Sequence, residues 1–130
     1  MKVFLNPGHA LNGNPDPGAV NGETGLRECD VALAVGESAE SYLNAAGVET
    51  ELLQSDSLYD ICEAANSSDA DIFVSIHCNA AEAEEANGTE TWACAGSYRG
   101  SVLASCIQSQ LVDALDITDR GVKIATPGVN

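Results

Sequence analysis

Two histidines are the residues of this sequence best placed to do chemistry. His9 follows the short apolar run 3–5, and His77 ends the clearest apolar run, 71–77. Both runs are typical of strands, and in α/β proteins reactive groups gather in loops beyond the carboxyl ends of strands. Two imidazoles at such positions suggest a metal site, and this site needs a third ligand.

A carboxylate is the expected third ligand, and two lie close to each other along the chain. Glu28 falls in the first turn of an expected helix, where the helix dipole favours a negative charge, and Glu23 is the alternative. Gly22 and Gly25 allow a turn tight enough to bring a carboxylate at a helix start beside a histidine at a strand end. Two histidines and one glutamate around an open position form the catalytic zinc arrangement, which generates hydroxide near neutral pH. Two unrelated histidines remain the alternative from these residues alone.

Cys78 competes as a ligand because it follows His77 directly. Adjacent residues of a strand point to opposite faces, so we expect Cys78 to be a small core residue rather than a ligand or a nucleophile. The chain has five cysteines with irregular spacing and no CxxC pair, which indicates reduced and mostly buried thiols. They are Cys29, Cys62, Cys78, Cys94 and Cys106.

Apolar periodicity predicts strands and helices in alternation. We expect strands at 3–5, 48–53, 71–77 and 89–94, and helices at 26–46, from 58 onward, and at 97–115. The run 71–77 has the composition of a strand in the middle of a covered sheet. The alternation favours an α/β fold in which helices cover a sheet.

The composition excludes several classes of function. At 130 residues the chain is expected to be one domain, and its formal net charge of -15 with only five Lys and Arg disfavours nucleic acid and anionic membranes as partners. The sequence contains no apolar run long enough for a membrane span, and Met1–Lys2 leads into a strand rather than a signal peptide. We therefore expect synthesis in the cytoplasm without a signal peptide.

Four stretches of the sequence together resemble a known family. They are VFLNPGHALNGNPDPGAVNGETGLRE, AANSSDADIFVSIHCNAAEAEEANGTETW, GSVLASCIQSQL and DRGVKI. In this order, over essentially all 130 residues, they resemble the zinc-dependent N-acetylmuramoyl-L-alanine amidases of the amidase-3 family, which are cell-wall hydrolases and phage endolysins. The resemblance implies three α/β/α layers with a mostly parallel (mixed) sheet and helices on both faces. It also implies His9, Glu28 and His77 as Zn²⁺ ligands, and peptidoglycan as the substrate, cut between N-acetylmuramic acid and L-alanine.

One part of the family pattern has no counterpart here. The general-base glutamate belongs in a segment after DRGVK that usually reads PAVLVE, which would lie beyond Asn130. We therefore expect a catalytic domain that is truncated at its C-terminus, that acts at the bacterial cell wall, and that could self-associate through exposed apolar surface. The absence of a signal peptide favours an endolysin over a secreted autolysin. The alternatives are a metal-binding or wall-binding module without catalysis and a metal-free acidic α/β domain.

Overall fold

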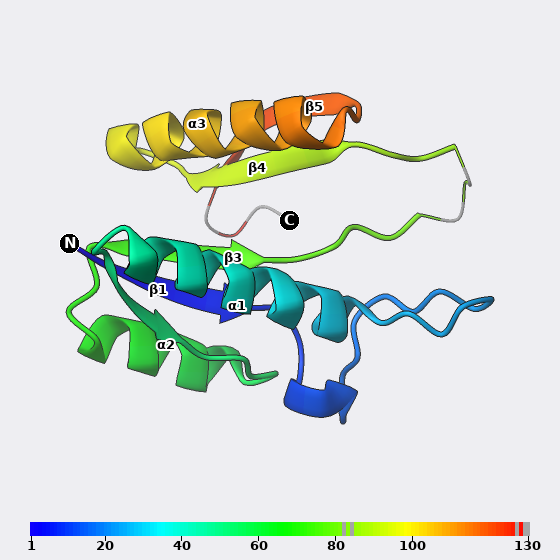
Figure 1. Ribbon diagram of the computed structural model, residues 1–130, viewed down its shortest axis with the longest axis horizontal. Coiled ribbons are helices and arrows are strands. Elements are labelled where there is room, and N and C mark those ends of the chain that lie inside the picture. The colour runs from blue at the N-terminus through cyan, green and yellow to red at the C-terminus, as the bar shows by residue number, and fades with distance from the viewer. Residues whose placement is uncertain (82, 84, 127, 129–130) are drawn as a thin grey trace. The chain divides into compact units, whose positions relative to one another are not determined.

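The computed structural model describes all residues except 82, 84, 127 and 129–130 (Figure 1). The chain divides into two compact units, Met1–Ala80 and Ala81–Asn130. Parallel strands and helices make up both units, so the α/β class expected from the sequence is confirmed. A single domain over residues 1–130 stays a prediction.

The first unit is built on a three-stranded parallel sheet. Strand β1 (Lys2–Pro7) lies between β2 (Glu49–Leu52) and β3 (Ile72–Ile76). Pairing on both sides buries β1 almost completely, whereas Phe73 of β3 is half exposed. The prediction of 71–77 as a central strand is therefore wrong for this sheet, because an apolar run does not by itself distinguish a central strand from an edge strand.

Two helices of the first unit form close to where the sequence predicts them. Helix α1 (Glu28–Ala45) packs on β1 and β2, and a Cβ atom at Gly36 would lie 2.7 Å from Pro7 Cγ, so glycine permits this close approach. Helix α2 (Leu58–Ser67) begins after Ser57, whose hydroxyl accepts a hydrogen bond from the Asp60 N–H and caps the helix. The buried apolar residues of this unit are Val3, Phe4, Leu5, Ala10, Cys29, Ala32 and Ile61.

The long connection between β1 and α1 is tied to the start of the helix by backbone hydrogen bonds. It contains one short 3₁₀ helix, η1 (Leu11–Gly13). The Glu28 N–H donates to the Ala19 carbonyl at 2.8 Å, and the Cys29 N–H donates to the Pro17 carbonyl at 3.1 Å. These bonds satisfy two of the free donors of the first helical turn, so the loop fixes where α1 begins.

The second unit is a strand–helix–strand motif. Strand β4 (Thr89–Cys94) pairs in parallel with β5 (Asp119–Ala125), and α3 (Tyr98–Leu115) connects them. The sequence did not predict β5 as a strand. Its register shifts opposite Thr89 and Thr91, and Gly121 has a φ of +80° there, so this bulge interrupts the period of two on which strand prediction depends.

The burial of the cysteines differs from the prediction made from the sequence. Only Cys29 is buried and Cys78 is half-buried, so the prediction of mostly buried thiols is wrong. The other three, Cys62, Cys94 and Cys106, are exposed, and all five are free. The reason is that two of them lie on outward faces of α2 and α3, which a sequence pattern of small apolar residues does not separate from inward faces. Within the described residues, no helix combines the length and the apolar character that crossing a membrane requires.

Candidate metal centre

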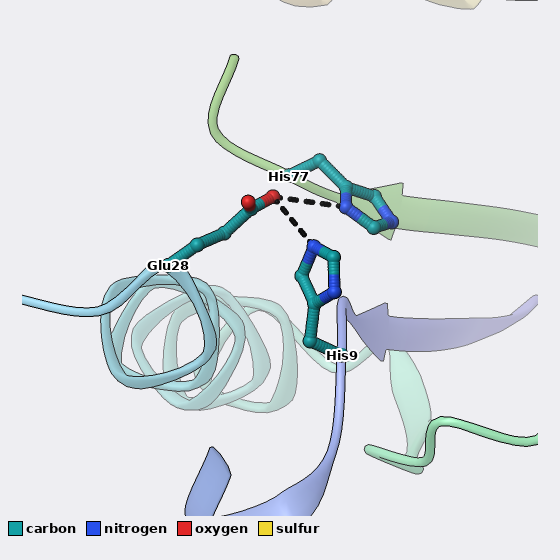
Figure 2. Close-up of side chains that lie close together, drawn as sticks. All are labelled: His9, Glu28 and His77. Carbon is teal, nitrogen blue, oxygen red and sulfur yellow. Dashed lines mark hydrogen bonds and ion pairs between the residues drawn. The ribbon is translucent and has the colours of Figure 1, made fainter. Parts of the chain in front are cut away.

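His9, Glu28 and His77 come together at the end of the three-stranded sheet where β1 and β3 finish (Figure 2). Glu28 Oε1 lies 3.1 Å from His9 Nε2 and 3.0 Å from His77 Nδ1. The two imidazole rings meet edge to face, with centroids 5.0 Å apart. The three candidate ligands named from the sequence are therefore neighbours in space.

The parallel pairing of β1 and β3 explains why the two histidines meet. Pro7 lies opposite Ile76 in the register, so His9 and His77 follow the carboxyl-terminal ends of two neighbouring strands. Glu28 opens α1 beside them, and its side chain is only 5% exposed, whereas that of His77 is 51% exposed. The site is therefore closed on the Glu28 side and open to solvent on the His77 side.

Backbone donors hold both oxygens of the Glu28 carboxylate. Oε2 accepts a hydrogen bond from the Ala19 N–H at 2.9 Å, and Oε1 accepts one from the Cys78 N–H at 2.8 Å. Burial by itself would raise the pKa of this carboxyl, but the two N–H donors and the two nearby imidazoles outweigh it and leave the pKa below its ordinary value of 4.5. Glu28 is therefore an anion at neutral pH.

Asp16 orients the His9 ring, and the sequence reasoning missed it. Its Oδ2 lies 2.8 Å from His9 Nδ1, and its Oδ1 accepts the Gly18 N–H at 2.9 Å. An ionised carboxylate only accepts hydrogen bonds, so His9 keeps a proton on Nδ1 and directs Nε2 toward Glu28. The one sequence signal was an acidic residue inside a loop of Gly and Pro after a candidate ligand.

Two glycines make room for the site. A Cβ atom at Gly8 would overlap the His77 ring, and one at Gly18 would lie 2.5 Å from His9 Cδ2 and 2.7 Å from Glu28 Oε2. The turn expected at Gly22 and Gly25 imposes no such restriction, because a Cβ at either glycine would have no atom within 4 Å beyond those of the adjacent residues. Gly8 and Gly18 are thus the glycines that the close packing of the three side chains requires.

The two rival ligands lie outside this cluster. Glu23 is exposed in a turn, where its N–H donates to the Asn21 side chain. Cys78 contributes its backbone N–H to Glu28, and burial raises the pKa of its thiol, which disfavours the thiolate that metal binding and nucleophilic attack require. The geometry therefore favours Glu28 over Glu23, and Cys78 supports the site through its backbone N–H rather than its thiol.

The donor set fits zinc. Two imidazole nitrogens and one carboxylate oxygen are the ligand types of catalytic zinc sites. Tetrahedral bonds of ordinary zinc–ligand length separate the donor atoms by about 3.3 Å, close to the 3.0 and 3.1 Å between Glu28 Oε1 and the two imidazole nitrogens. Among the described residues, this is the one cluster of His, Cys, Asp and Glu side chains with such spacing.

A comparison with known families matches nearly the whole chain. The family model described as N-acetylmuramoyl-L-alanine amidase matches residues 3–129, nearly the whole chain. The chain belongs to this amidase family.

Relatives of this amidase-family chain include curated proteins and solved structures. It is 39% identical to the N-acetylmuramoyl-L-alanine amidase LytC of Bacillus subtilis (strain 168), over 95% of the chain and 25% of LytC. It is 41% identical to the uncharacterized protein YqiI of the same strain, over 93% of the chain and 59% of YqiI. The N-acetylmuramoyl-L-alanine amidase AmiC2 of Nostoc punctiforme superposes with a TM-score of 0.82 at 31% identity, over 96% of the chain and 69% of AmiC2. The chain thus spans a quarter of LytC and about three fifths of YqiI.

The charges of the site predict how the stability of the metal-free amidase domain changes with pH. Glu28 has a pKa below its ordinary 4.5, so its contribution is present above that pH and is lost as the pH falls through the folded-state value. For His9, burial lowers the pKa, but the contacts with Asp16 and Glu28 raise it overall above the ordinary 6.5. Its contribution is therefore complete below pH 6.5 and is lost as the pH rises through the raised value.

We therefore expect the Tm of the metal-free chain to be highest between pH 4.5 and 6.5 and to decline on either side. Thermal unfolding in the presence of a chelator, from about pH 4 to about pH 8, measures this. His9→Gln should flatten the alkaline decline because glutamine does not titrate there. Added zinc should oppose the decline, because zinc binds the unprotonated imidazole. An equal alkaline decline in His9→Gln would refute the role assigned to His9.

Proposed function

We propose that this chain hydrolyses the amide bond between N-acetylmuramic acid and L-alanine in peptidoglycan, with Zn²⁺ held by His9, Glu28 and His77. The observation that carries the proposal is the convergence of three zinc-type donor atoms at an open sheet edge, in a chain of the amidase family. LytC and AmiC2, to which the chain is similar, are both named N-acetylmuramoyl-L-alanine amidases. Such a chain acts at the bacterial cell wall.

The ligand residues suit the chemistry that the metal would supply. Bound zinc polarises a carbonyl and lowers the pKa of a bound water. Glu28 is the only anion of the three, so the ligand set cancels just one of the two zinc charges and preserves its power as a Lewis acid. His77, half exposed at the open side, leaves a polymeric substrate a route to the metal.

The general base is assigned to no residue of this chain. In the family pattern that glutamate follows DRGVK, at a position beyond Asn130.

The decisive experiment measures new amino groups of L-alanine released from purified peptidoglycan. We expect release that stops when zinc is chelated, returns when zinc is restored, and falls to background in His77→Ala. Glu23→Ala, an acidic residue of the same loop outside the cluster, is the matched control and should retain release. If the zinc-loaded chain pelleted with cell walls and freed no L-alanine-terminated peptides, the protein would be a wall-binding module instead of an enzyme.

A further inference from the structure

Gln54 joins the two backbone segments that carry His9 and Glu28. It lies two residues beyond β2, and only 8% of it is exposed. Its side-chain Nε2 donates to the Gly8 carbonyl at 3.0 Å and to the Cys29 carbonyl at 2.9 Å. Gly8 directly precedes His9, and Cys29 directly follows Glu28, so one buried amide group links the neighbours of two ligands.

A second buried amide extends this link to the strand that carries His77. Asn6 of β1 donates through Nδ2 to the Leu53 carbonyl at 3.0 Å, next to Gln54. Its Oδ1 accepts a hydrogen bond from the Ser75 hydroxyl at 2.9 Å, two residues before His77. Asn6 is 4% exposed. The two amides therefore connect the ends of β1 and β3, the β2 exit and the first turn of α1 beneath the candidate ligands.

Burying an amide group lowers the stability of the folded chain unless the group is hydrogen-bonded. The amides of Gln54 and Asn6 therefore restrict the positions of the backbone groups that they bond. A chain needs no amide at residue 54 to fill that space, since an apolar side chain of similar size would do so. The hydrogen bonds from Gln54 specify the distance between the loop after β1 and the start of α1. This distance decides whether His9 Nε2 and Glu28 Oε1 can share a metal ion.

We propose that Gln54 is a positioning residue of the metal centre, which holds the backbones of His9 and Glu28 at the separation that zinc requires. The inference rests on the proposed function, because it takes the three-residue cluster to be a zinc site. Small displacements of metal ligands have large consequences, and losing a partner that orients ligands typically costs about 10–100-fold in metal affinity.

The test replaces Gln54 by methionine, which keeps the length of the side chain but cannot donate. We expect Gln54→Met to bind zinc about 10–100-fold more weakly than the wild type. With cobalt in place of zinc, the visible absorption spectrum should also change, because that spectrum reports the geometry of the ligands. Both measurements are made well below the Tm of each variant.

The matched control is Gln108, the other buried glutamine bonded to a backbone carbonyl. Gln108 is 4% exposed, its Nε2 donates to the Thr89 carbonyl at 2.8 Å, and its Oε1 accepts from the Thr91 hydroxyl, all within the second unit. Gln108→Met should lower the Tm and leave zinc affinity and the cobalt spectrum unchanged. This control separates a general loss of stability from a loss of ligand position.

The zinc affinity of Gln54→Met decides whether Gln54 positions the ligands. If Gln54→Met binds zinc as tightly as Gln108→Met and the wild type, Gln54 is structural only and the inference is overturned. If Gln54→Met does not fold, Gln54→Asn, whose shorter amide can reach at most one of the two carbonyls, must show the same weakening for the inference to stand. If the wild type binds no zinc, the proposed metal centre fails, and this inference fails with it.

Discussion

Glu28→Ala is expected to abolish stoichiometric zinc binding. The substitution removes the one anionic candidate ligand and leaves only two imidazoles facing each other. The loss of affinity should exceed the about 10–100-fold that removal of a partner outside the ligand set costs. Zinc content after dialysis, and competition with a chromophoric chelator, measure the effect.

The same substitution should also destabilise the metal-free chain. The N–H groups of Ala19 and Cys78 lose the carboxylate oxygens that accept their hydrogen bonds. A buried donor left without a partner costs roughly 1–3 kcal/mol, so circular dichroism must accompany the zinc measurement. Glu28→Gln keeps an oxygen for one of these two donors but no charge, so it should fold better than Glu28→Ala and still bind zinc poorly.

Glu23→Ala is the control for this prediction, because Glu23 was the competing carboxylate and lies exposed in a turn. It should bind zinc as the wild type does. Wild-type zinc affinity in Glu28→Ala, or loss of zinc in Glu23→Ala, would show that the ligand assignment is wrong.

Gly18→Ala is expected to have the second-largest effect, since it disturbs two ligands at once. A Cβ atom there would lie 2.5 Å from His9 Cδ2 and 2.7 Å from Glu28 Oε2, far inside ordinary contact distance. The φ of +69° adds a backbone penalty of about 1–2 kcal/mol for any residue with a Cβ. Overpacking adds about 1–3 kcal/mol more, and both ligands must move, so zinc binding should be lost.

Gly25→Ala separates the two contributions. Gly25 has a φ of +72°, nearly that of Gly18, and a Cβ placed there would have no atom within 4 Å beyond those of the adjacent residues. It should therefore show the backbone penalty alone and bind zinc normally. Denaturant unfolding gives the free energy of unfolding of each variant, and zinc titration gives its affinity. Equal zinc affinities in the two variants would mean that the space at Gly18 does not matter to the site.

Local patterns in the sequence were sufficient to find most helices and strands. Helix α1 repeats small and apolar residues with helical spacing, and α2 has a Ser cap at its start, so the approximate extent of α1 and the start of α2 follow from neighbouring residues alone. Strand β5 was not predicted because its bulge at Gly121 breaks the alternation of inward and outward side chains. The central place of β1 was not predicted because pairing on both sides is a property of the whole sheet.

The sequence by itself determined the chemistry available to this protein. Only two histidines are present, both follow strands, and a glutamate opens the next helix, so residue type and strand-end position were enough to name three candidate ligands. The resemblance to the amidases then gave the reaction. These inferences were possible because residue chemistry and the ends of secondary structure elements are encoded locally.

Only the tertiary structure decided how those groups meet. The register of β1 against β3 aligns His9 with His77, and the loop that bonds to the first turn of α1 selects Glu28 over Glu23. The tertiary structure also revealed the roles of Asp16, Gly8, Gly18 and Gln54. These roles depend on contacts between residues up to 69 positions apart in the sequence. The physical reason is that hydrogen-bond partners and close contacts are set by the packing of distant segments, which no local pattern contains.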